Sequence, residues 1–195
     1  MSTADRRTRI IDAAIDLIAT QGLRALTHRA LDTTLALPPG SVSYYFRTKR
    51  ALIEAIVDRI ATRSRADFTE ARLGDPQPST TEPDEIAHGI ARWLDQLLAR
   101  RRNHLIVRHA LIIDQLGDPD LHRRLTSCLF SHDHATSLFR SLGAADPATS
   151  AADFIAVLEG LVFDRFAGAR RGSKAGTPRS VAQLEAPLRA QLSAR

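Results

Sequence analysis

The stretch that decides the fold runs from Thr27 to Lys49 and reads THRALDTTLALPPGSVSYYFRTK. It begins with a short helical pattern, because the Thr27 hydroxyl can accept a hydrogen bond from the otherwise unpaired amides of a first helical turn. Apolar residues then recur on one face of this helix at helical spacing: Ala30, Leu31 and Leu35. The pattern predicts a helix that packs one face and leaves the other in solvent.

A pair of prolines separates this helix from the next. Pro38 cannot continue a helix, whereas Pro39 fits the first turn of a new one. The second pattern, residues 41–46, is short, and Thr48 then precedes a third and longer pattern as its expected cap. Two short helices joined by a compact turn predict a helix-turn-helix, whose second helix enters the major groove of DNA.

A plain helical hairpin inside a bundle is the alternative interpretation of the same pattern. Composition favours the helix-turn-helix, because a helix meant for burial would not carry Pro39, Gly40, Ser41 and Ser43. Small polar residues near a helix N-terminus suit a backbone that approaches phosphates and base edges closely. We interpret Val42 and Phe46 of the second helix as core residues.

Residues 6–60 resemble the DNA-binding domain of the TetR family of bacterial transcriptional regulators. An amphipathic first helix ends in Gln21-Gly22-Leu23, a helix beginning at Thr27 follows, and the block Gly40-Ser41-Val42-Ser43-Tyr44-Tyr45-Phe46 precedes Lys49. The family pattern is a Gly-Thr/Ser-hydrophobe-Tyr-Tyr-aromatic/His-Phe block followed by Ser-Lys. The resemblance covers about a quarter of the chain.

The resemblance implies a set of DNA contacts. In the family, the first helix of the helix-turn-helix contacts phosphate at its start, and the second helix contacts the bases at its start. An aromatic pair follows, and then a lysine that binds phosphate. The corresponding residues here are Thr27, His28, Pro39, Gly40, Ser41, Ser43, Tyr44, Tyr45 and Lys49. Three positions depart from the family pattern: Ser43 replaces a common Tyr, Tyr45 a common His, and Ala36 a common turn Gly.

The second helix of the motif, residues 41–46, is the one expected to read DNA and is called the reading helix. It carries no Arg, Asn or Gln, so it lacks the side chains that contact bases in a bidentate manner. We therefore expect affinity to come mainly from phosphate contacts, with hydroxyls, methyl contacts and DNA shape supplying the base preference. Tyr44 admits two interpretations, a DNA contact or a half-buried packing aromatic. The N-terminal arginines Arg6, Arg7 and Arg9 likewise fit either phosphate contact or a solvated chain end.

The bulk composition agrees with a globular DNA-binding protein without identifying one. Lys and Arg number 27 against 22 Asp and Glu, and residues 1–60 hold nine basic and six acidic groups, more than half of the net excess. One cysteine rules out an intramolecular disulfide and fits a reducing compartment. With no long apolar run and no apolar leader near the start, we expect a cytoplasmic protein without a membrane span.

Hydrophobic periodicity predicts an all-α chain, and nothing alternates as a strand would. About nine helices are expected, at residues 6–21, 27–35, 41–46, 48–72, 83–99, 103–116, 120–142, 146–170 and 177–193. The first three form the head, residues 1–50. The helix 48–72 joins it to a ligand-binding and dimerisation domain, residues 51–195.

The body of such proteins holds a small-molecule pocket and a dimer interface. Residues that could line the pocket are Trp93, Leu97, His109, Ile113, Leu125, Cys128, Leu129, His132, Phe154 and Leu158. The last two helices carry more apolar surface than one body needs, so they predict an isologous interface with a second copy. Its candidate residues are Phe154, Leu158, Leu161, Val162, Phe166, Val181, Leu184 and Leu188.

Metal and catalytic chemistry have little support in the sequence. His132 and His134 are two residues apart and point to different helix faces, and no spacing typical of paired metal ligands occurs. No catalytic triad, carboxylate pair or phosphate loop is recognisable. We expect no cofactor, no metal and no enzyme activity.

The expected function is a DNA-binding transcriptional regulator, a repressor, that binds a palindromic operator as a homodimer and responds to an unknown small-molecule effector. The alternative is an all-α small-molecule carrier or enzyme in which the segment 27–49 only packs.

Overall fold

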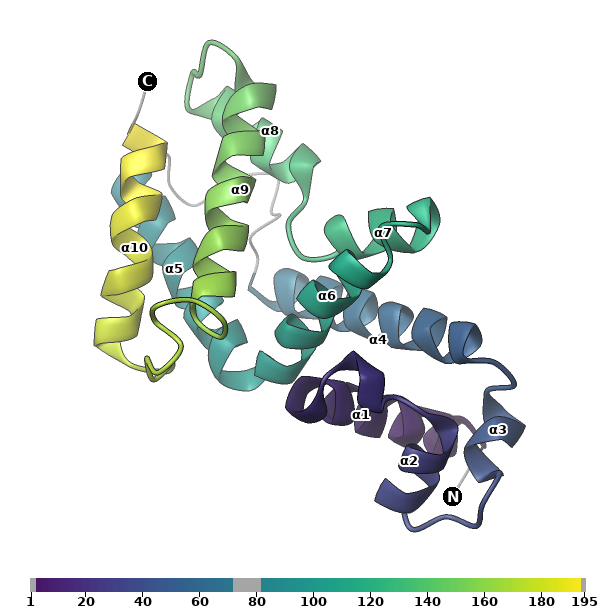
Figure 1. The fold of residues 1–195 in the computed structure, drawn as a ribbon. Helices are drawn as coiled ribbons and strands as arrows, with labels where there is room; N and C mark the ends of the chain where they lie inside the picture. The colour runs from purple at the N-terminus through teal and green to yellow at the C-terminus, as the bar shows by residue number, and fades with distance from the viewer. Residues whose placement is uncertain (1–2, 72–81, 194–195) are drawn as a thin grey trace. The chain divides into compact units, whose positions relative to one another are not determined.

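The computed structural model describes residues 3–71 and 82–193, which form ten α-helices and one short 3-10 helix without a strand (Figure 1). The all-α prediction is confirmed. The helices are α1 Thr3–Gln21, α2 His28–Thr34, α3 Ser41–Tyr45, α4 Lys49–Glu70, α5 Pro83–Arg100, α6 Arg102–Asp114, α7 Pro119–Thr126, α8 His132–Ser141, α9 Pro147–Asp164 and α10 Pro178–Ser193; the 3-10 helix is Leu23–Ala25. The expected helix 48–72 is α4, and Arg72 lies outside the described residues.

The chain divides into two compact units that do not follow a boundary at residue 50. The first unit holds residues 1–64 and 103–128, and the second holds residues 65–102 and 129–195. Helices α6 and α7 therefore belong with the helix-turn-helix head. Helix α4 contributes residues 49–64 to the first unit and residues 65–70 to the second.

The core of the first unit is one apolar cluster built from both parts of the sequence. Helix α1 contributes the stripe that its periodicity predicts, including Ile10 and Ile15, and α4 contributes Ile56. Helices α6 and α7 complete the cluster with Leu111 and Leu125. Burial stabilises the fold by roughly 1.5–3 kcal/mol for each large aliphatic side chain. Helices α6 and α7 therefore contribute to the stability of the first unit.

A buried arginine fixes the connection between α6 and α7. Arg108 is fully buried, and its Nε donates to the carbonyl of Leu125 at 2.8 Å. Its Nη2 donates to the carbonyl of Thr126 at 3.2 Å. These are carbonyls at the end of α7, which have no partner within the helix, so Arg108 acts as the C-terminal cap of α7 from the neighbouring helix.

The single helix predicted over 120–142 is wrong, because the structure breaks it between α7 and α8. The hydroxyls of Ser127 and Thr126 turn back onto the carbonyl of Arg123 at 2.9 and 3.1 Å. Ser131 then caps α8 by accepting from the amide of His134 at 3.3 Å. Short hydroxyl side chains compete with the helix for its own backbone groups, and apolar periodicity does not register that competition. Helix α9 also ends earlier than predicted, at Asp164.

In the second unit α5 packs against α10, and α8 packs against α9. A buried carboxylate connects this core to the segment before α10. Asp95 accepts a hydrogen bond from the amide of Gly176 at 2.9 Å and one from the hydroxyl of Ser180 at 2.5 Å. Arg165 donates to the same hydroxyl, and burial lowers the pKa of its guanidinium from the ordinary value. These polar groups fix where α10 begins.

The turn between α2 and α3 is closed by a residue in an uncommon conformation. Ala36 has φ 51° and is the only non-glycine residue with positive φ in the described parts of the chain. The amide of Leu37 donates to the carbonyl of Asp32 at 2.8 Å, and the amide of Ala36 donates to that of Thr33 at 3.1 Å. This is the Schellman arrangement, in which glycine normally occupies the position of Ala36.

We predict that Ala36→Gly raises the free energy of unfolding by about 1 kcal/mol, because a left-handed conformation strains a residue that has a Cβ. Gly40, with φ 88° and open space where a Cβ would stand, is the matched control. Gly40→Ala should lower stability by a similar amount, and the double variant should return close to wild type. Urea denaturation measures all three, and a loss of stability in Ala36→Gly would contradict the strain.

Candidate nucleic-acid interface

The start of the reading helix α3 is held by a carboxylate from α2. Asp32 is 5% exposed, and its two oxygens accept from the amides of Gly40 and Val42, each at 2.8 Å. The orphan amides at a helix N-terminus need such acceptors. Sequence reasoning counted Asp32 only as a charge, since nothing in the local pattern shows that it reaches ten residues along the chain.

This carboxylate changes the expected role of the helix start. The amide of Ser41 donates to the carbonyl of Pro38 at 3.1 Å. With Gly40 and Val42 engaged by Asp32, the first three amides of the turn are all occupied. A negative group already sits where a phosphate would have to bind. The amides of Gly40, Ser41 and Val42 thus have acceptors within the protein, whereas the DNA contacts expected of these residues stay a prediction.

The other end of α3 is held by an arginine from α1. Arg7 donates from Nη1 to the carbonyl of Tyr45 at 2.7 Å. Its guanidinium carbon lies 4.4 Å from the centre of the Phe46 ring, within the range of a cation–π contact. Arg7 thus contacts the protein, whereas the sequence left it open between phosphate contact and a solvated end.

The outward face of α3 presents hydroxyls and an aromatic ring. Tyr44 is 80% exposed, and it meets Tyr45 edge to face with 5.2 Å between ring centres. Ser43 lies half-buried beside them. Val42 and Phe46 are buried, which confirms their interpretation as core. An exposure of 80% is incompatible with the packing interpretation of Tyr44 within the protomer.

The remaining predicted DNA contacts lie around α3. Thr27 caps α2 by accepting from the amide of Ala30 at 3.1 Å, and Pro39, Gly40 and Lys49 are exposed. The hydroxyl of Ser41 donates to the carbonyl of Pro38 at 2.6 Å. The Nε2 of His28 is buried, so a phosphate contact from this ring would have to use Nδ1.

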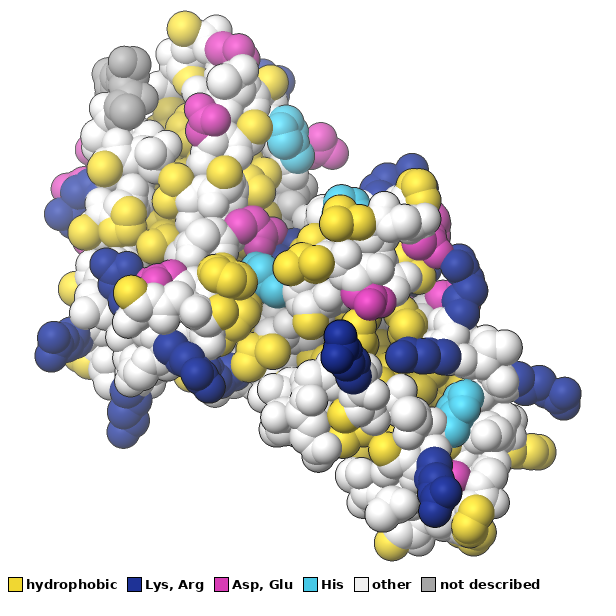
Figure 2. All heavy atoms as spheres, viewed as in Figure 1, with side chains coloured by type: hydrophobic (Ala, Val, Ile, Leu, Met, Phe, Trp, Pro, Cys, Tyr) yellow, Lys and Arg dark blue, Asp and Glu magenta, His cyan; other side chains and the backbone are white. Residues whose placement is uncertain are grey.

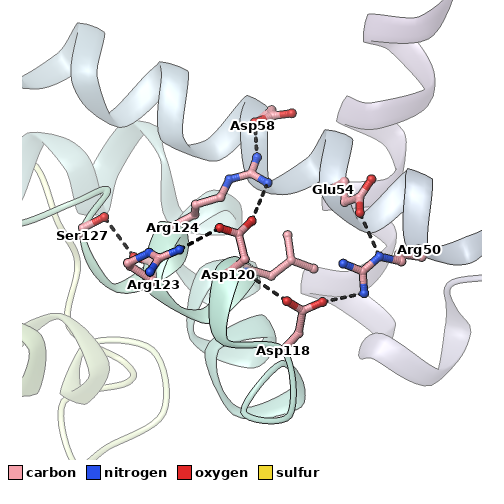
Figure 3. Close-up of polar contacts among 9 residues, drawn as sticks. Arg50, Glu54, Asp58, Asp118, Asp120, Arg123, Arg124 and Ser127 are labelled. Carbon is pink, nitrogen blue, oxygen red and sulfur yellow. Dashed lines mark hydrogen bonds and ion pairs between the residues drawn. The ribbon is translucent and has the colours of Figure 1, made fainter.

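Arg50 follows Lys49 in the chain, but its guanidinium is engaged by carboxylates (Figure 3). Its Nη1 lies 2.5 Å from Asp118, and its Nε lies 2.9 Å from Glu54. Asp118 also caps α7 by accepting from the amide of Leu121 at 3.3 Å. That amide, and then Arg50, hold the pKa of Asp118 below its ordinary value. Arg124 of α7 pairs in turn with Asp58 of α4 and Asp120.

On the face that Figure 2 shows, positive charge is dispersed rather than gathered in one patch. Figure 2 shows Lys and Arg side chains scattered over the face in view, with acidic side chains between them. Besides Arg50, Arg59 is engaged, since it makes a bidentate pair with Asp12 at 2.9 and 2.8 Å. Of the basic residues around α3 and the start of α4, Arg47 and Lys49 have neither an ion pair nor a hydrogen bond from their side chains within the described parts of the chain.

The second unit holds a pocket of about 170 Å³ between the end of α4 and the second half of α5. Its lining residues are Asp67, Glu70, Ala71, Trp93, Gln96, Leu97, Arg100 and Arg101. Arg101 makes two hydrogen bonds to Asp67, at 3.0 and 3.2 Å. Trp93 forms its apolar wall and packs edge to face against Phe68 and Phe130.

Two of the predicted pocket residues line the pocket just described, and the others lie elsewhere in the described parts of the chain. Trp93 and Leu97 line the pocket just described. Leu129, Phe154 and Leu158 are buried in the core of the second unit, and His132 and Ile113 are exposed. His109, Ile113, Leu125 and Cys128 belong to the first unit, because α6 and α7 pack with the head. Helical spacing assigns residues to faces but does not show which unit a face packs against.

The predicted dimer residues also divide between two environments. Those buried in the protomer core are Phe154, Leu158, Val162, Leu184 and Leu188; Leu161, Phe166 and Val181 are half-buried. The solvent face of α9 instead carries Ala152, Ala156, Gly160 and Phe163. The richness of α9 in apolar residues thus has two sources, an inner face that fills the body and an outer face of mostly small residues.

Within residues 3–71 and 82–193, no group of three or more His, Cys, Asp or Glu side chains is arranged to hold a metal ion. Over the same residues, no helix is both long enough and apolar enough to cross a membrane.

Known structures share the fold of this chain. The multidrug binding protein EbrR, solved with imidazole, is 24% identical with a TM-score of 0.63, and the match covers 95% of this chain and 94% of EbrR. A transcriptional regulator from Rhodococcus sp. Rha1 is 20% identical with a TM-score of 0.73, over 95% of this chain and 93% of the regulator.

Sequence comparisons place the similarity on both parts of the chain. The transcriptional regulator UidR of Escherichia coli K12 is 34% identical over 64 residues, which are 33% of this chain and 33% of UidR. Residues 10–56 match the family model described as bacterial regulatory proteins, tetR family. Residues 81–194, more than half of the chain, match the one described as tetracyclin repressor-like, C-terminal domain. With a head and a body that both match, the chain belongs to the TetR family of bacterial regulatory proteins.

Proposed function

We propose that this protein is a DNA-binding transcriptional repressor that reads a palindromic operator as a homodimer and releases or binds it according to a small molecule held in its body. The observation that carries the DNA-binding part is the geometry of α3. Five residues are held at both ends by charged side chains from α1 and α2, while Tyr44 and the Ser43 edge face solvent. The alternative, a carrier or enzyme, does not account for a short helix fixed in this way whose outer face is left in solvent.

Phosphate contact is proposed for Lys49, and DNA contact also for Thr27 and the aromatic pair Tyr44 and Tyr45. Neutralising a phosphate releases condensed counterions, so each contact makes affinity fall with salt. Lys49 is an exposed cation at the first position of α4, whereas its neighbour Arg50 is already paired with Asp118. Arg47 is a second exposed cation beside α3 without a partner in the described parts of the chain, so we expect the salt dependence of one head to reflect these two side chains.

We predict that Lys49→Ala weakens binding to all duplexes alike and reduces the slope of log K against log salt by about 0.9 for each protomer. Fluorescence anisotropy with a duplex selected from a randomised library, measured over a range of salt, gives both quantities. Lys174→Ala is the matched control, because it removes the same charge from an exposed position in the body. An unchanged slope in Lys49→Ala would remove Lys49 from the interface.

The pocket beside Trp93 is the proposed effector site. EbrR has been solved with ethidium and with malachite green, but the pocket here is close in volume to a cavity of about 150 Å³ that holds one benzene. Arg101 and Asp67 neutralise each other, and Glu70 and Arg100 at the rim carry opposite charges. A pocket of this volume, with equal numbers of positive and negative side chains in its lining, suits a neutral compound with a single ring.

We predict that benzyl alcohol quenches or shifts the fluorescence of Trp93, the only tryptophan of the chain, in a saturable manner. Benzoate and benzylammonium should bind at least about tenfold more weakly, because their charge loses hydration on entering the pocket and the half-buried ion pair there, Arg101 with Asp67, is already complete. Ala71→Leu places a larger side chain in the pocket, so the ligand would be overpacked there. Overpacking typically costs about 1–3 kcal/mol, and the low end of that range corresponds to binding about tenfold weaker. Equal binding by wild type and Ala71→Leu would place the ligand elsewhere.

The outer face of α9 is the proposed dimer interface. Ala152, Ala156 and Gly160 follow one another at intervals of four residues, and Phe163 completes the same face. Small residues in this spacing allow two helices to approach closely, and a two-fold axis makes the same face serve both copies.

We predict that Gly160→Arg converts the dimer to a monomer, measured by sedimentation equilibrium, and lowers affinity for a palindromic duplex far more than for a half-site. Ser137→Arg adds the same side chain to an exposed position of α8 and should leave the dimer intact. A Gly160→Arg dimer of wild-type affinity would show that another face is used.

A further inference from the structure

Among the arginines near the chain start, Arg7 is placed to act on the reading helix rather than on phosphate. The carbonyl of Tyr45 lies at the C-terminal end of α3, where helix carbonyls lack partners within the helix and the helix dipole is negative. Arg7 supplies a cation and a hydrogen-bond donor there, at 2.7 Å. Its guanidinium also lies 4.4 Å from the centre of the buried Phe46 ring.

A helix of five residues is too short to hold its own direction. Nucleation of a helix is unfavourable, and isolated helices shorter than about twelve residues are marginal in water. Helix α3 therefore takes its orientation from its surroundings. Asp32 fixes the N-terminal end through two amides, and Arg7 fixes the C-terminal end through one carbonyl and one ring. If either end is released, α3 can pivot about the other.

The side chains that read DNA make this orientation important. Ser41 and Ser43 are shorter than the Arg or Gln that commonly contact bases, and Tyr44 carries a rigid ring, so none of them can adjust by extending toward a base edge. A small rotation of α3 would move them out of hydrogen-bonding range, since such bonds weaken steeply beyond their usual geometry. Contacts from Lys49, which lies on a different helix, would persist.

We propose that Arg7 is a positioning residue for base recognition, which orients α3 through the Tyr45 carbonyl and the Phe46 ring and does not bind a phosphate. This inference rests on the proposed DNA-binding function. The two roles can be distinguished by experiment, because a phosphate contact and a positioning contact change different measured quantities. Loss of a phosphate contact lowers the salt slope and preserves base preference, whereas loss of a positioning contact preserves the slope and lowers base preference.

The experiment compares wild type with Arg7→Gln, Arg7→Lys and Arg6→Gln in the full chain. Each protein is titrated against a duplex that wild type selects from a randomised library and against a scrambled duplex of the same composition, over a range of salt. Arg6 is the matched control, because it precedes Arg7 in the same turn of α1 and makes no hydrogen bond or ion pair to α3 within the described residues. Thermal melting shows that every protein is folded at the temperature used.

Arg7→Gln should reduce the ratio of selected to scrambled affinity by about tenfold, the size of one good base contact, while the salt slope stays at the wild-type value. Arg7→Lys keeps a cation that can reach the Tyr45 carbonyl and should recover part of the ratio. Arg6→Gln should keep the full ratio. These three results together support the positioning role.

The opposite pattern would overturn it. A salt slope that falls by about 0.9 per protomer with an unchanged ratio would make Arg7 a phosphate contact. A ratio and a slope that both stay at wild-type values would make it an ordinary surface arginine. If wild type itself bound no duplex in a salt-dependent manner, the proposed function would fail, and this outcome is distinct from a change confined to the Arg7 variants.

Discussion

Asp32 extends its carboxylate from α2 to the start of α3 and accepts hydrogen bonds from the amides of Gly40 and Val42. The geometry of the head follows from this contact. A buried carboxylate must find donors to offset its lost hydration, and the first turn of α3 offers amides that need acceptors. The left-handed turn at Gly40 and the Schellman turn at Ala36 bring the two together. Helix α2 therefore supports α3 by a charge as well as by apolar packing.

The same principle, a charged side chain that caps a neighbouring helix, recurs through the first unit. Arg7 caps the end of α3, Arg108 caps the end of α7, and Asp118 caps the start of α7 while it pairs with Arg50 of α4. Short helices such as α3 and α7 depend on such contacts because few of their own hydrogen bonds are complete. The exposed pairs among them contribute little stability individually. Their effect is to fix the directions of helices that packing alone would leave loose.

Periodicity predicted most of the fold because the long helices carry regular apolar stripes. Helices α1, α4, α5, α6 and α10 lie close to their expected ranges, and the caps at Thr27 and Thr48 were visible as single hydroxyl residues before apolar runs. The break between α7 and α8 was missed, since the hydroxyls of Ser127 and Ser131 alter backbone hydrogen bonds without altering the apolar pattern. Asp32 and Arg7 were missed as clamps for a related reason. Asp32 contacts a residue 10 positions away and Arg7 one 38 positions away, and local spacing does not indicate such pairs.

The site departs from its expected chemistry in one respect that follows from these clamps. Anion binding at a helix N-terminus requires free amides, and Asp32 occupies two of those of α3. Phosphate attraction must then come from cations on other helices, and Arg50 and Arg59 are already paired with carboxylates of the protein. Arg47 and Lys49, which have no such partner in the described parts of the chain, are left to supply the electrostatic attraction that does not depend on base sequence. With only hydroxyls and Tyr44 facing outward from α3, discrimination depends on how accurately the helix is held, and the carboxylate that excludes phosphate from its N-terminus is the same group that holds it.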